Sequence, residues 1–210
     1  MRARPLPFLF ALALLAPGCG DETGPLPTAL QPAYSTMAGD PIHILQQSPG
    51  APPLQTYQTS FTVRKGQAFT LAVDYEPAAG ETVGKPFVRF DLPRDGLIAG
   101  AGGAHLDRGD SVVMTLSIDS LGFSVDFGPS GVKFSAKSPA RLTICYQNMD
   151  PDLNRDGVVD ATDQALQQQI SFWYQSMKAG SWFKLPTKYD SANPCISTPL
   201  YHFSQYAVSW

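Results

Sequence analysis

Between Asp152 and Asp163 the chain carries oxygen-bearing side chains at a spacing that suits a metal ion. The donors are four carboxylates and one amide: Asp152, Asn154, Asp156, Asp160 and Asp163. Carboxylate and amide oxygens are hard ligands, of which Ca²⁺ takes about six to eight. No His or Cys belongs to the group, so a zinc site is not expected. The spacing therefore predicts a calcium loop, and the alternative is a solvated acidic loop that binds no ion.

These twelve residues resemble the loop of an EF-hand. In that resemblance Gly157 takes the sixth position, where the chain must turn sharply with positive φ. The backbone carbonyl oxygen of Val158 becomes a ligand at the seventh position. Asp160 would act through a water molecule at the ninth position, and Asp163 would close the loop at the twelfth.

An Asp at the last position, in place of Glu, makes the loop similar to a dockerin repeat. Dockerins pair two such repeats and dock onto cohesins, so the resemblance implies docking at a cell surface. This chain carries a single repeat, and Gln164 stands where dockerins have an apolar residue. Val159 is expected to anchor the loop to the core, and residues 162–169 are compatible with a short helix after the loop. Residues 150–169 lie between two predicted strands, so we expect them to be an insertion.

The N-terminal residues indicate that the chain is exported. Residues 1–18 combine a basic start, an apolar run too short to span a bilayer, and small residues before Cys19, as in bacterial lipoprotein signals. We expect Cys19 to carry a lipid anchor, and the alternative is cleavage after Gly18 without lipid. Gly20 does not favour retention at the inner membrane. The expected location is the bacterial cell envelope, at the outer membrane or in the periplasm.

The two other cysteines, Cys145 and Cys195, are expected to form a disulfide. An oxidising compartment allows the bond, which would close a loop of about fifty residues and contribute about 3–4 kcal/mol through loop-closure entropy. The alternative is two buried free thiols. No local signature supports a cysteine nucleophile.

The rest of the chain reads as a tether followed by strands. Residues 19–54 are rich in Pro, Gly, Ser, Thr and Gln without a sustained period, which is typical of a tether. From residue 55 apolar and polar side chains alternate, as strands with one buried face require. Gly and Pro turns separate the runs, of which the clearest are 69–75, 88–92, 112–118, 123–127, 142–146, 170–175, 181–185 and 200–209. We therefore predict a mainly β fold, a β-sandwich over residues 55–210 with one inserted calcium loop and a short helix.

Four short motifs lie within residues 85–210. They are FGPSGVKF at 127–134, PARLTI at 139–144, WFKLP at 182–186 and HFSQYA at 202–207. Together they resemble the ZU-type domain, a β-sandwich of zona-occludens proteins, ankyrins and netrin receptors, and a similar module of bacterial lipoproteins. ZU-type modules mostly bind or scaffold, so the resemblance implies a role other than enzymatic catalysis.

The same resemblance raises self-cleavage at His202, Phe203 and Ser204, because some ZU-type domains cut themselves at a His-Phe-Ser step. Ser204 Oγ would attack the carbonyl carbon of Phe203, and water would open the resulting ester, with His202 as the candidate base. The alternative is that this segment is simply the last strand, with Phe203 or Tyr206 in the core.

The charge and aromatic composition of the chain limits the classes of partner that it is expected to bind. The chain has 15 Lys and Arg against 18 Asp and Glu, so it has no basic excess for binding nucleic acid. Aromatic residues at 173, 174, 182, 183 and 189 could stack on sugars if exposed on one face, or could pack in the core. The sequence thus predicts an exported, lipid-anchored, calcium-binding surface module with a binding or structural role. The alternative is a carbohydrate-associated or dockerin-like docking protein. Expected partners are the membrane, through the anchor, and a protein or glycan; the oligomeric state stays open.

Overall fold

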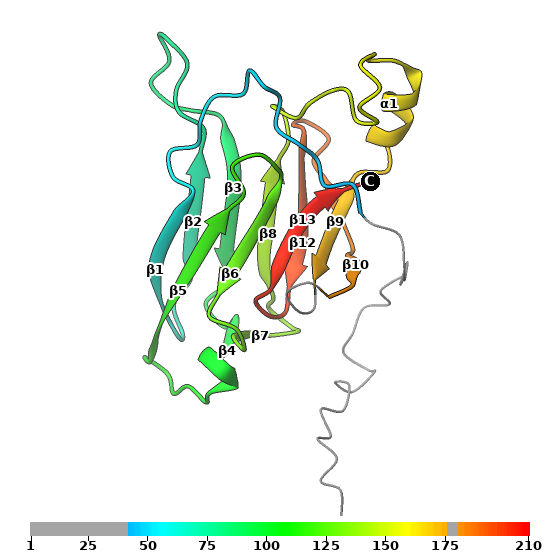
Figure 1. Cartoon of the computed structure of the whole chain (residues 1–210). Coiled ribbons are helices and arrows are strands. Elements are labelled where there is room, and N and C mark those ends of the chain that lie inside the picture. Colours follow the sequence, from blue (N-terminus) through cyan, green and yellow to red (C-terminus); the bar gives the residue numbers. More distant parts are fainter. Residues whose placement is uncertain (1–41, 176–179) are drawn as a thin grey trace, which may run out of the picture. The chain divides into compact units, whose positions relative to one another are not determined.

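A computed structural model describes residues 42–175 and 180–210 (Figure 1). All of them belong to one unit of the chain, Pro32–Trp210. The predicted signal peptide (1–18), Cys19 and most of the predicted tether lie outside the described residues. Within the described ranges, no helix has the length and hydropathy that a membrane crossing requires.

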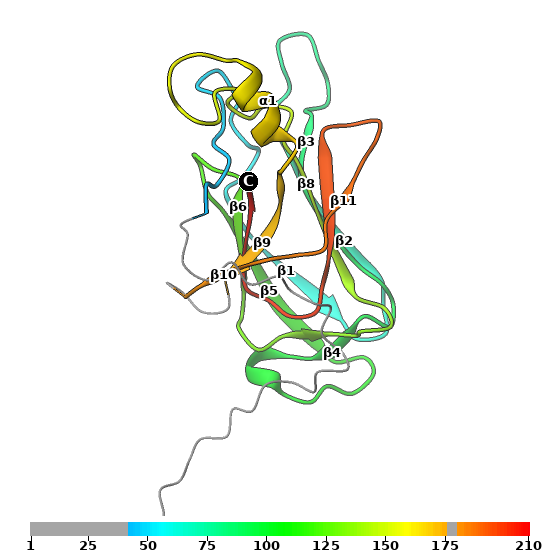
Figure 2. The ribbon, with the colours of Figure 1, turned by 90° about the vertical axis from the view of Figure 1, so that its right-hand side faces the viewer.

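Two antiparallel β-sheets, seen as two layers in Figure 2, make up most of this unit. The six-stranded sheet has the order β1-β5-β6-β13-β9-β10, and the five-stranded sheet has the order β11-β12-β8-β3-β2. Strands β4 and β7 pair as a separate ribbon. The strands are β1 (Gln58–Arg64), β2 (Phe69–Asp74), β3 (Pro86–Leu92), β4 (Leu97–Ala99), β5 (Ser111–Ile118), β6 (Ser124–Gly128), β7 (Lys133–Phe134), β8 (Ala140–Cys145), β9 (Ser171–Gln175), β10 (Trp182–Lys184), β11 (Lys188–Tyr189), β12 (Cys195–Leu200) and β13 (Gln205–Ser209).

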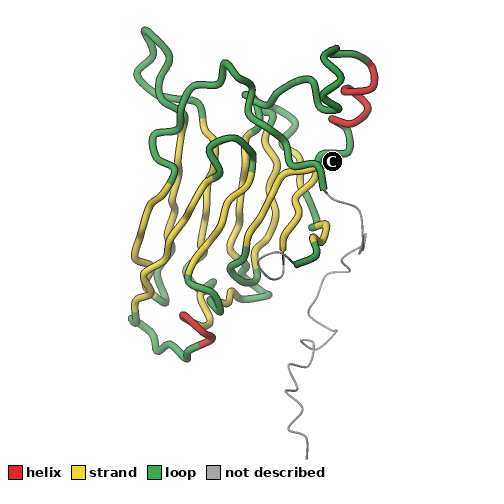
Figure 3. Tube along the Cα trace, in the orientation of Figure 1, coloured by secondary structure: helices red, strands yellow, loops and turns green. Residues whose placement is uncertain are grey.

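Helical structure in the described residues is limited to a short 3-10 turn, η1 (Ala101–Gly103), and one helix, α1 (Ala161–Gln167) (Figure 3). The helix and the loop before it are inserted between β8 and β9. The prediction of a mainly β fold, a sandwich with one inserted loop and a short helix, is confirmed.

Strand β5 shows how the alternating sequence produces the sandwich. Val112, Met114, Leu116 and Ile118 are buried, whereas Val113 between them is 62% exposed. Successive side chains of a strand point to opposite faces of the sheet. The apolar set therefore faces the opposite sheet, and the other set faces away from it.

Aromatic rings join the two sheets at the centre of the core. Phe90 of β3 is fully buried. Its ring centroid lies 5.4 Å from that of Phe127 on β6 and 6.0 Å from that of Phe61 on β1. Phe203, which precedes β13, lies 5.9 Å from Phe90. Such tilted ring pairs add about 0.5–1.5 kcal/mol each beyond the burial of their area.

The boundary between tether and domain lies earlier than the sequence predicts. The composition predicts that residues 42–54 belong to the tether, but Leu45 and Leu54 are buried in the core. The Leu45 N–H donates to the Val208 carbonyl oxygen at 2.9 Å, and the Leu45 carbonyl oxygen accepts the Phe123 N–H at 2.9 Å. Isolated bridges of this kind pair the backbone without forming a regular strand. A Pro-rich segment without periodicity can therefore still pack on the domain.

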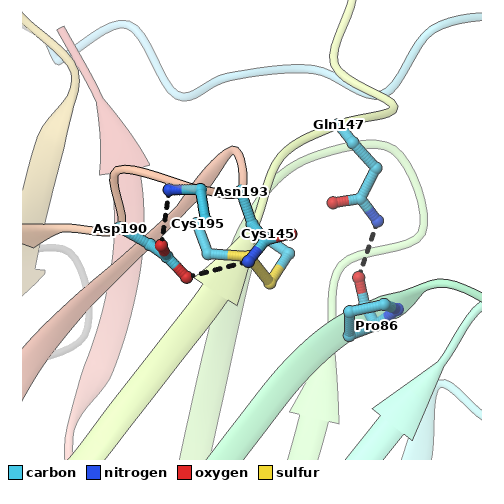
Figure 4. Close-up of a disulfide and its surroundings, with 7 residues drawn as sticks. Pro86, Cys145, Gln147, Asp190, Asn193 and Cys195 are labelled. Carbon is cyan, nitrogen blue, oxygen red and sulfur yellow. Dashed lines mark hydrogen bonds between the residues drawn. A yellow bond between two sulfur atoms is a disulfide. The ribbon is translucent and has the colours of Figure 1, made fainter.

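Cys145 and Cys195 form a disulfide, as predicted (Figure 4). They are directly paired residues of β8 and β12, with Cα atoms 3.9 Å apart. Asp190 organises the turn that leads into Cys195. Its Oδ1 accepts the Ala192 N–H at 2.8 Å, and its Oδ2 accepts the Asn193 side-chain N–H at 3.1 Å. The bond thus links two neighbouring strands of the five-stranded sheet beside a hydrogen-bonded turn.

Candidate functional site

The predicted calcium loop lies at one end of the sandwich, beside α1 (Figure 1). Helix α1 begins with Asp160 as its N-cap, whose Oδ1 accepts the Thr162 N–H at 2.7 Å. The Asp160 N–H in turn donates to Asp163 Oδ2 at 2.9 Å. The Asp163 N–H also donates to the Asp160 side chain, and the reciprocal bonds between Asp160 and Asp163 form a capping box, which satisfies helix N–H groups that have no partner within the helix. The last two predicted ligands therefore also start the helix.

The first half of the loop is wound around the carboxylate of Asp152. Asp152 Oδ1 accepts the Asp156 N–H at 3.2 Å, and Oδ2 accepts the Gly157 N–H at 2.8 Å. Gly157 has φ of 88°, a left-handed conformation that glycine adopts without steric cost. The sharp turn expected at this position is therefore present.

Two further predicted ligands form local turns of their own. Asn154 Oδ1 accepts the Asp156 N–H at 3.0 Å, and Asp156 Oδ1 accepts the Val158 N–H at 2.9 Å. The Asn154 amide also donates to Asp156 Oδ2 at 2.9 Å. Side chains that bond to backbone two residues ahead are typical of turns built on Asn and Asp. The alternating spacing noted in the sequence is the spacing that these turns need.

Asp163 ties the end of the loop to its beginning. Its side chain is 3% exposed, and its Oδ1 accepts the N–H groups of Leu153 at 2.7 Å and Asn154 at 3.2 Å. The pKa of Asp163 is lowered, mainly by the N–H of Asp160; burial opposes this, and the N–H groups of Asn154 and Leu153 lower the pKa further. The buried carboxylate is thus held in its charged form at neutral pH.

The side chains of the loop offer the oxygen ligands that Ca²⁺ prefers. In this structure, however, the carboxylate oxygens accept hydrogen bonds from backbone N–H groups. In the described part of the chain, no group of three or more Asp, Glu, His or Cys side chains is placed so that it could hold a metal ion. An ionised carboxylate has about four acceptor positions, and the N–H bonds use only some of them. The residues therefore fit calcium by ligand type and loop conformation, and binding would require their oxygens to converge further.

The apolar anchor of the loop is not the predicted one. Val159 is 59% exposed, and so is Val158. Leu153 is buried in the core instead, and Leu166 of α1 packs against the core from its half-buried position. The prediction for Val159 is wrong because the side of the loop that faces the sandwich carries Leu153.

Two residues of the loop, Arg155 and Gly157, have positive φ. Arg155 has φ of 60°, a left-handed conformation that costs a residue with a side chain about 1–2 kcal/mol of conformational free energy. We expect Arg155→Gly to raise the free energy of unfolding by about 0.5 kcal/mol, because relief of this conformation exceeds the added entropy of the unfolded chain. Gly157→Ala should lower the free energy of unfolding by about 1 kcal/mol. No atom lies within 4 Å of the added methyl group, so only the backbone conformation opposes it. Urea denaturation measures both; changes of the same sign would contradict this account of the loop.

The three residues of the predicted self-cleavage step lie in the turn between β12 and β13. The sequence predicts one strand over 200–209, but β12 ends at Leu200 and β13 begins at Gln205. Phe203 is buried, and its ring centroid lies 4.9 Å from that of Phe127. The Ser204 hydroxyl donates to the Gln175 carbonyl oxygen, and His202 Nδ1 lies 3.3 Å from the Phe203 carbonyl oxygen. Burial lowers the pKa of His202.

We expect the purified protein to show no fragment that ends at Phe203. The Ser204 hydroxyl proton is engaged by the Gln175 carbonyl, which is not a base that could accept it. Intact-mass spectrometry after prolonged incubation measures this directly, with Ser204→Ala as the matched control. A fragment ending at Phe203 in the wild type but not in Ser204→Ala would show that the chain cuts itself.

The aromatic residues considered as a sugar platform are mostly packed. Trp173 is 6% exposed, and Lys184 Nζ lies 5.8 Å from its ring centroid. Tyr174 stacks on Phe183 with centroids 5.3 Å apart. Tyr189 is 51% exposed, with its hydroxyl donating to the Ile170 carbonyl oxygen. The structure therefore does not bring these residues together as one exposed face.

A hollow of about 510 Å³ lies beside the loop, and no motif in the sequence predicts it. Its lining includes Ile42, Ile44, Leu153, Arg155, Leu166 and Trp210. The Trp210 ring stacks on His43 with centroids 5.2 Å apart. The hollow joins both ends of the described chain to the loop, so no local motif could reveal it.

Comparisons with protein families, curated proteins and solved structures found no match to this chain.

Proposed function

We propose that this protein is an exported, lipid-anchored, calcium-binding surface module with a binding or structural role. The observation that carries the proposal is the winding of the loop around Asp152, with Gly157 in the left-handed conformation. Oxygen donors that follow such a turn at alternating positions are the arrangement that calcium loops use. The ZU-type resemblance, which implies binding or scaffolding, points the same way.

In this proposal Asp152, Asn154, Asp156, the Val158 carbonyl oxygen and Asp163 hold the ion, and Asp160 acts through water. When bound, Ca²⁺ supplies a link between the start of the loop and the start of α1. The N–H bonds of Asp163 to Leu153 and Asn154 already join these two points. The ion would therefore make the existing link between the start of the loop and the start of α1 more rigid. It would also hold in place the loop residues that line the neighbouring hollow.

Cys19 would carry the lipid that attaches the chain to the membrane of the bacterial cell envelope. The binding role would then lie at the hollow beside the loop, where a protein or glycan partner meets Leu153, Arg155 and Trp210. No catalytic step belongs to this proposal.

Isothermal titration calorimetry of the full chain with CaCl₂ tests the ion site. We expect saturable binding with a dissociation constant on the order of 10⁻⁴–10⁻³ M, as for lone extracellular sites. Asp152→Asn should abolish it, and Glu81→Gln, which removes one charge from an exposed loop elsewhere, should not. Equal heats for the wild type and Asp152→Asn would refute the assigned site.

The second candidate is a carbohydrate-associated or dockerin-like docking protein, favoured by the exposed pair Val158 and Val159. Both side chains are 59% exposed, so the loop presents apolar surface to solvent. A panel of cohesins and glycans, with Ca²⁺ or with a chelator, separates the candidates. Calcium-dependent capture that is lost in a Val158→Ser/Val159→Ser variant would support docking, and capture that survives this change would oppose it.

A further inference from the structure

The other end of the sandwich carries a cluster of positive charge that the proposed function does not use. Figures 1 and 2 place β4 at the opposite end of the sandwich from α1. Here a hollow of about 280 Å³ is lined by Lys65, Arg94 and Arg108. These cations come from three different turns: the β1–β2 turn, the β3–β4 turn and the loop before β5. The fold therefore gathers charges that are far apart in the sequence.

Backbone carbonyl groups hold two of these cations, Lys65 and Arg94, in place. Lys65 Nζ donates to the Leu106 carbonyl oxygen at 2.6 Å, and Arg94 Nε donates to the Gly66 carbonyl oxygen at 3.1 Å. Each bond uses one donor, whereas an ammonium group has three and a guanidinium has five. Bonds to neutral carbonyls position the charges without neutralising them.

Gly66 is the point at which the two arginines meet. It has φ of 87°, and a Cβ placed on it would lie 3.3 Å from Arg108 Cγ and 3.4 Å from Arg108 Nε. Arg108 therefore packs over the glycine whose carbonyl accepts Arg94. The neighbouring turns also bond to each other, because the Lys65 N–H donates to the Asp110 carbonyl oxygen at 2.8 Å. The arrangement is a consequence of specific contacts between the turns.

Nearby carboxylates do not neutralise the cluster. Among the described residues, no carboxylate oxygen lies within salt-bridge distance of Lys65, Arg94 or Arg108. Asp95 is the one acidic residue that lines the hollow. Asp107 lies 3.4 Å from His105, and Asp110 Oδ2 accepts the Asp107 N–H. The lining thus carries three positive charges against one negative charge, in a chain whose formal net charge is -3.

We propose that this hollow binds a phosphate group. Phosphate oxygens accept hydrogen bonds from the planar guanidinium of arginine and from the compact ammonium of lysine. Such charge-assisted hydrogen bonds are about twice as strong as those between neutral groups. Leu97 and Ile98 form an apolar wall of the hollow, against which the carbon part of a phosphomonoester can pack. The group can belong to a soluble phosphate or to a lipid headgroup.

Titration of the full chain with inorganic phosphate and with glycerol 3-phosphate, at low ionic strength and without calcium, tests the site. We expect saturable binding that Arg94→Gln/Arg108→Gln weakens about tenfold, as the loss of charge-assisted bonds requires. Arg141→Gln removes an exposed arginine of β8 and should change the affinity less than about twofold. Melting curves establish that each variant is folded, and the single variants replace the double variant if it is not. Equal weakening by Arg141→Gln would overturn the proposal, and absence of saturable binding would leave a lipid headgroup as the single remaining source of the phosphate.

Vesicles of phosphatidic acid, compared with vesicles of phosphatidylcholine, identify the source of the phosphate. The full chain carries Cys19→Ala here, so that no lipid anchor contributes to vesicle binding. Retention on phosphatidic acid that is lost in Arg94→Gln/Arg108→Gln assigns the site to a headgroup. Binding of the soluble phosphates alone assigns it to a small ligand. If vesicles retain the wild type and the double variant equally and neither binds the soluble phosphates, the hollow is not a phosphate site.

Discussion

Replacing Cys145 and Cys195 together by alanine is expected to lower the free energy of unfolding by about 3–4 kcal/mol. The disulfide joins residues 50 positions apart, and its loss lets the unfolded chain explore many more conformations. For a domain of this size such a change lowers the melting temperature by roughly 10 °C. Both sulfur-bearing residues are buried, so alanine also removes a little apolar contact. Thermal melts under non-reducing conditions, followed by circular dichroism, measure the effect.

Reduction provides the matching control. Treatment of the wild type with dithiothreitol should lower its melting temperature toward that of the double variant, and should leave the double variant unchanged. The inserted loop lies between the two cysteines in sequence, since it follows β8 and precedes β12. A double variant that melts at the temperature of the oxidised wild type would show that the strand pairing alone determines this region's stability.

Alternation predicted the strands that have one buried and one open face, such as β5 and β6. It missed β12, whose sequence CISTPL contains two adjacent buried residues, Cys195 and Ile196, and a proline. Proline removes a donor from the sheet and normally argues against an inner strand. Pro199 is tolerated because β11 pairs only with Ser197 and Ile196, so β12 has an open edge beyond them. The short length of the neighbouring strand β11 cannot be inferred from the sequence of β12 itself.

The turns of the acidic loop could be predicted because their interactions are local, and calcium binding there stays a prediction. Asp152, Asn154 and Asp156 each bond to backbone within five residues, so their spacing carries the information. The two hollows could not be predicted, because each is lined by segments that only the folded sandwich brings together. The burial of Leu153 in place of Val159 likewise depends on which side of the loop faces the core. Local interactions could thus be predicted from the sequence, whereas of the long-range features the disulfide was predicted and the two hollows were not.

Calcium at 10 mM is expected to stabilise the protein by about 1.4–2.7 kcal/mol. This range follows from dissociation constants on the order of 10⁻³–10⁻⁴ M and from binding to the folded state alone. The proposed ligands at the two ends of the loop, Asp152 and Asp163, have no fixed geometry in the unfolded chain, so an ion bound there would favour the native state. Melting curves in calcium and in excess chelator measure the shift, with magnesium as a test of selectivity.

Asp152→Asn separates this effect from general screening of charge by salt. The amide keeps the size of the side chain but supplies one oxygen in place of two, so Oδ2 can no longer accept the Gly157 N–H. The variant should melt at the same temperature in calcium and in chelator, whereas Glu81→Gln should keep the full shift. A shift of equal size in all three proteins would mean that calcium acts on the surface as a whole, and that the acidic loop is a turn motif without an ion.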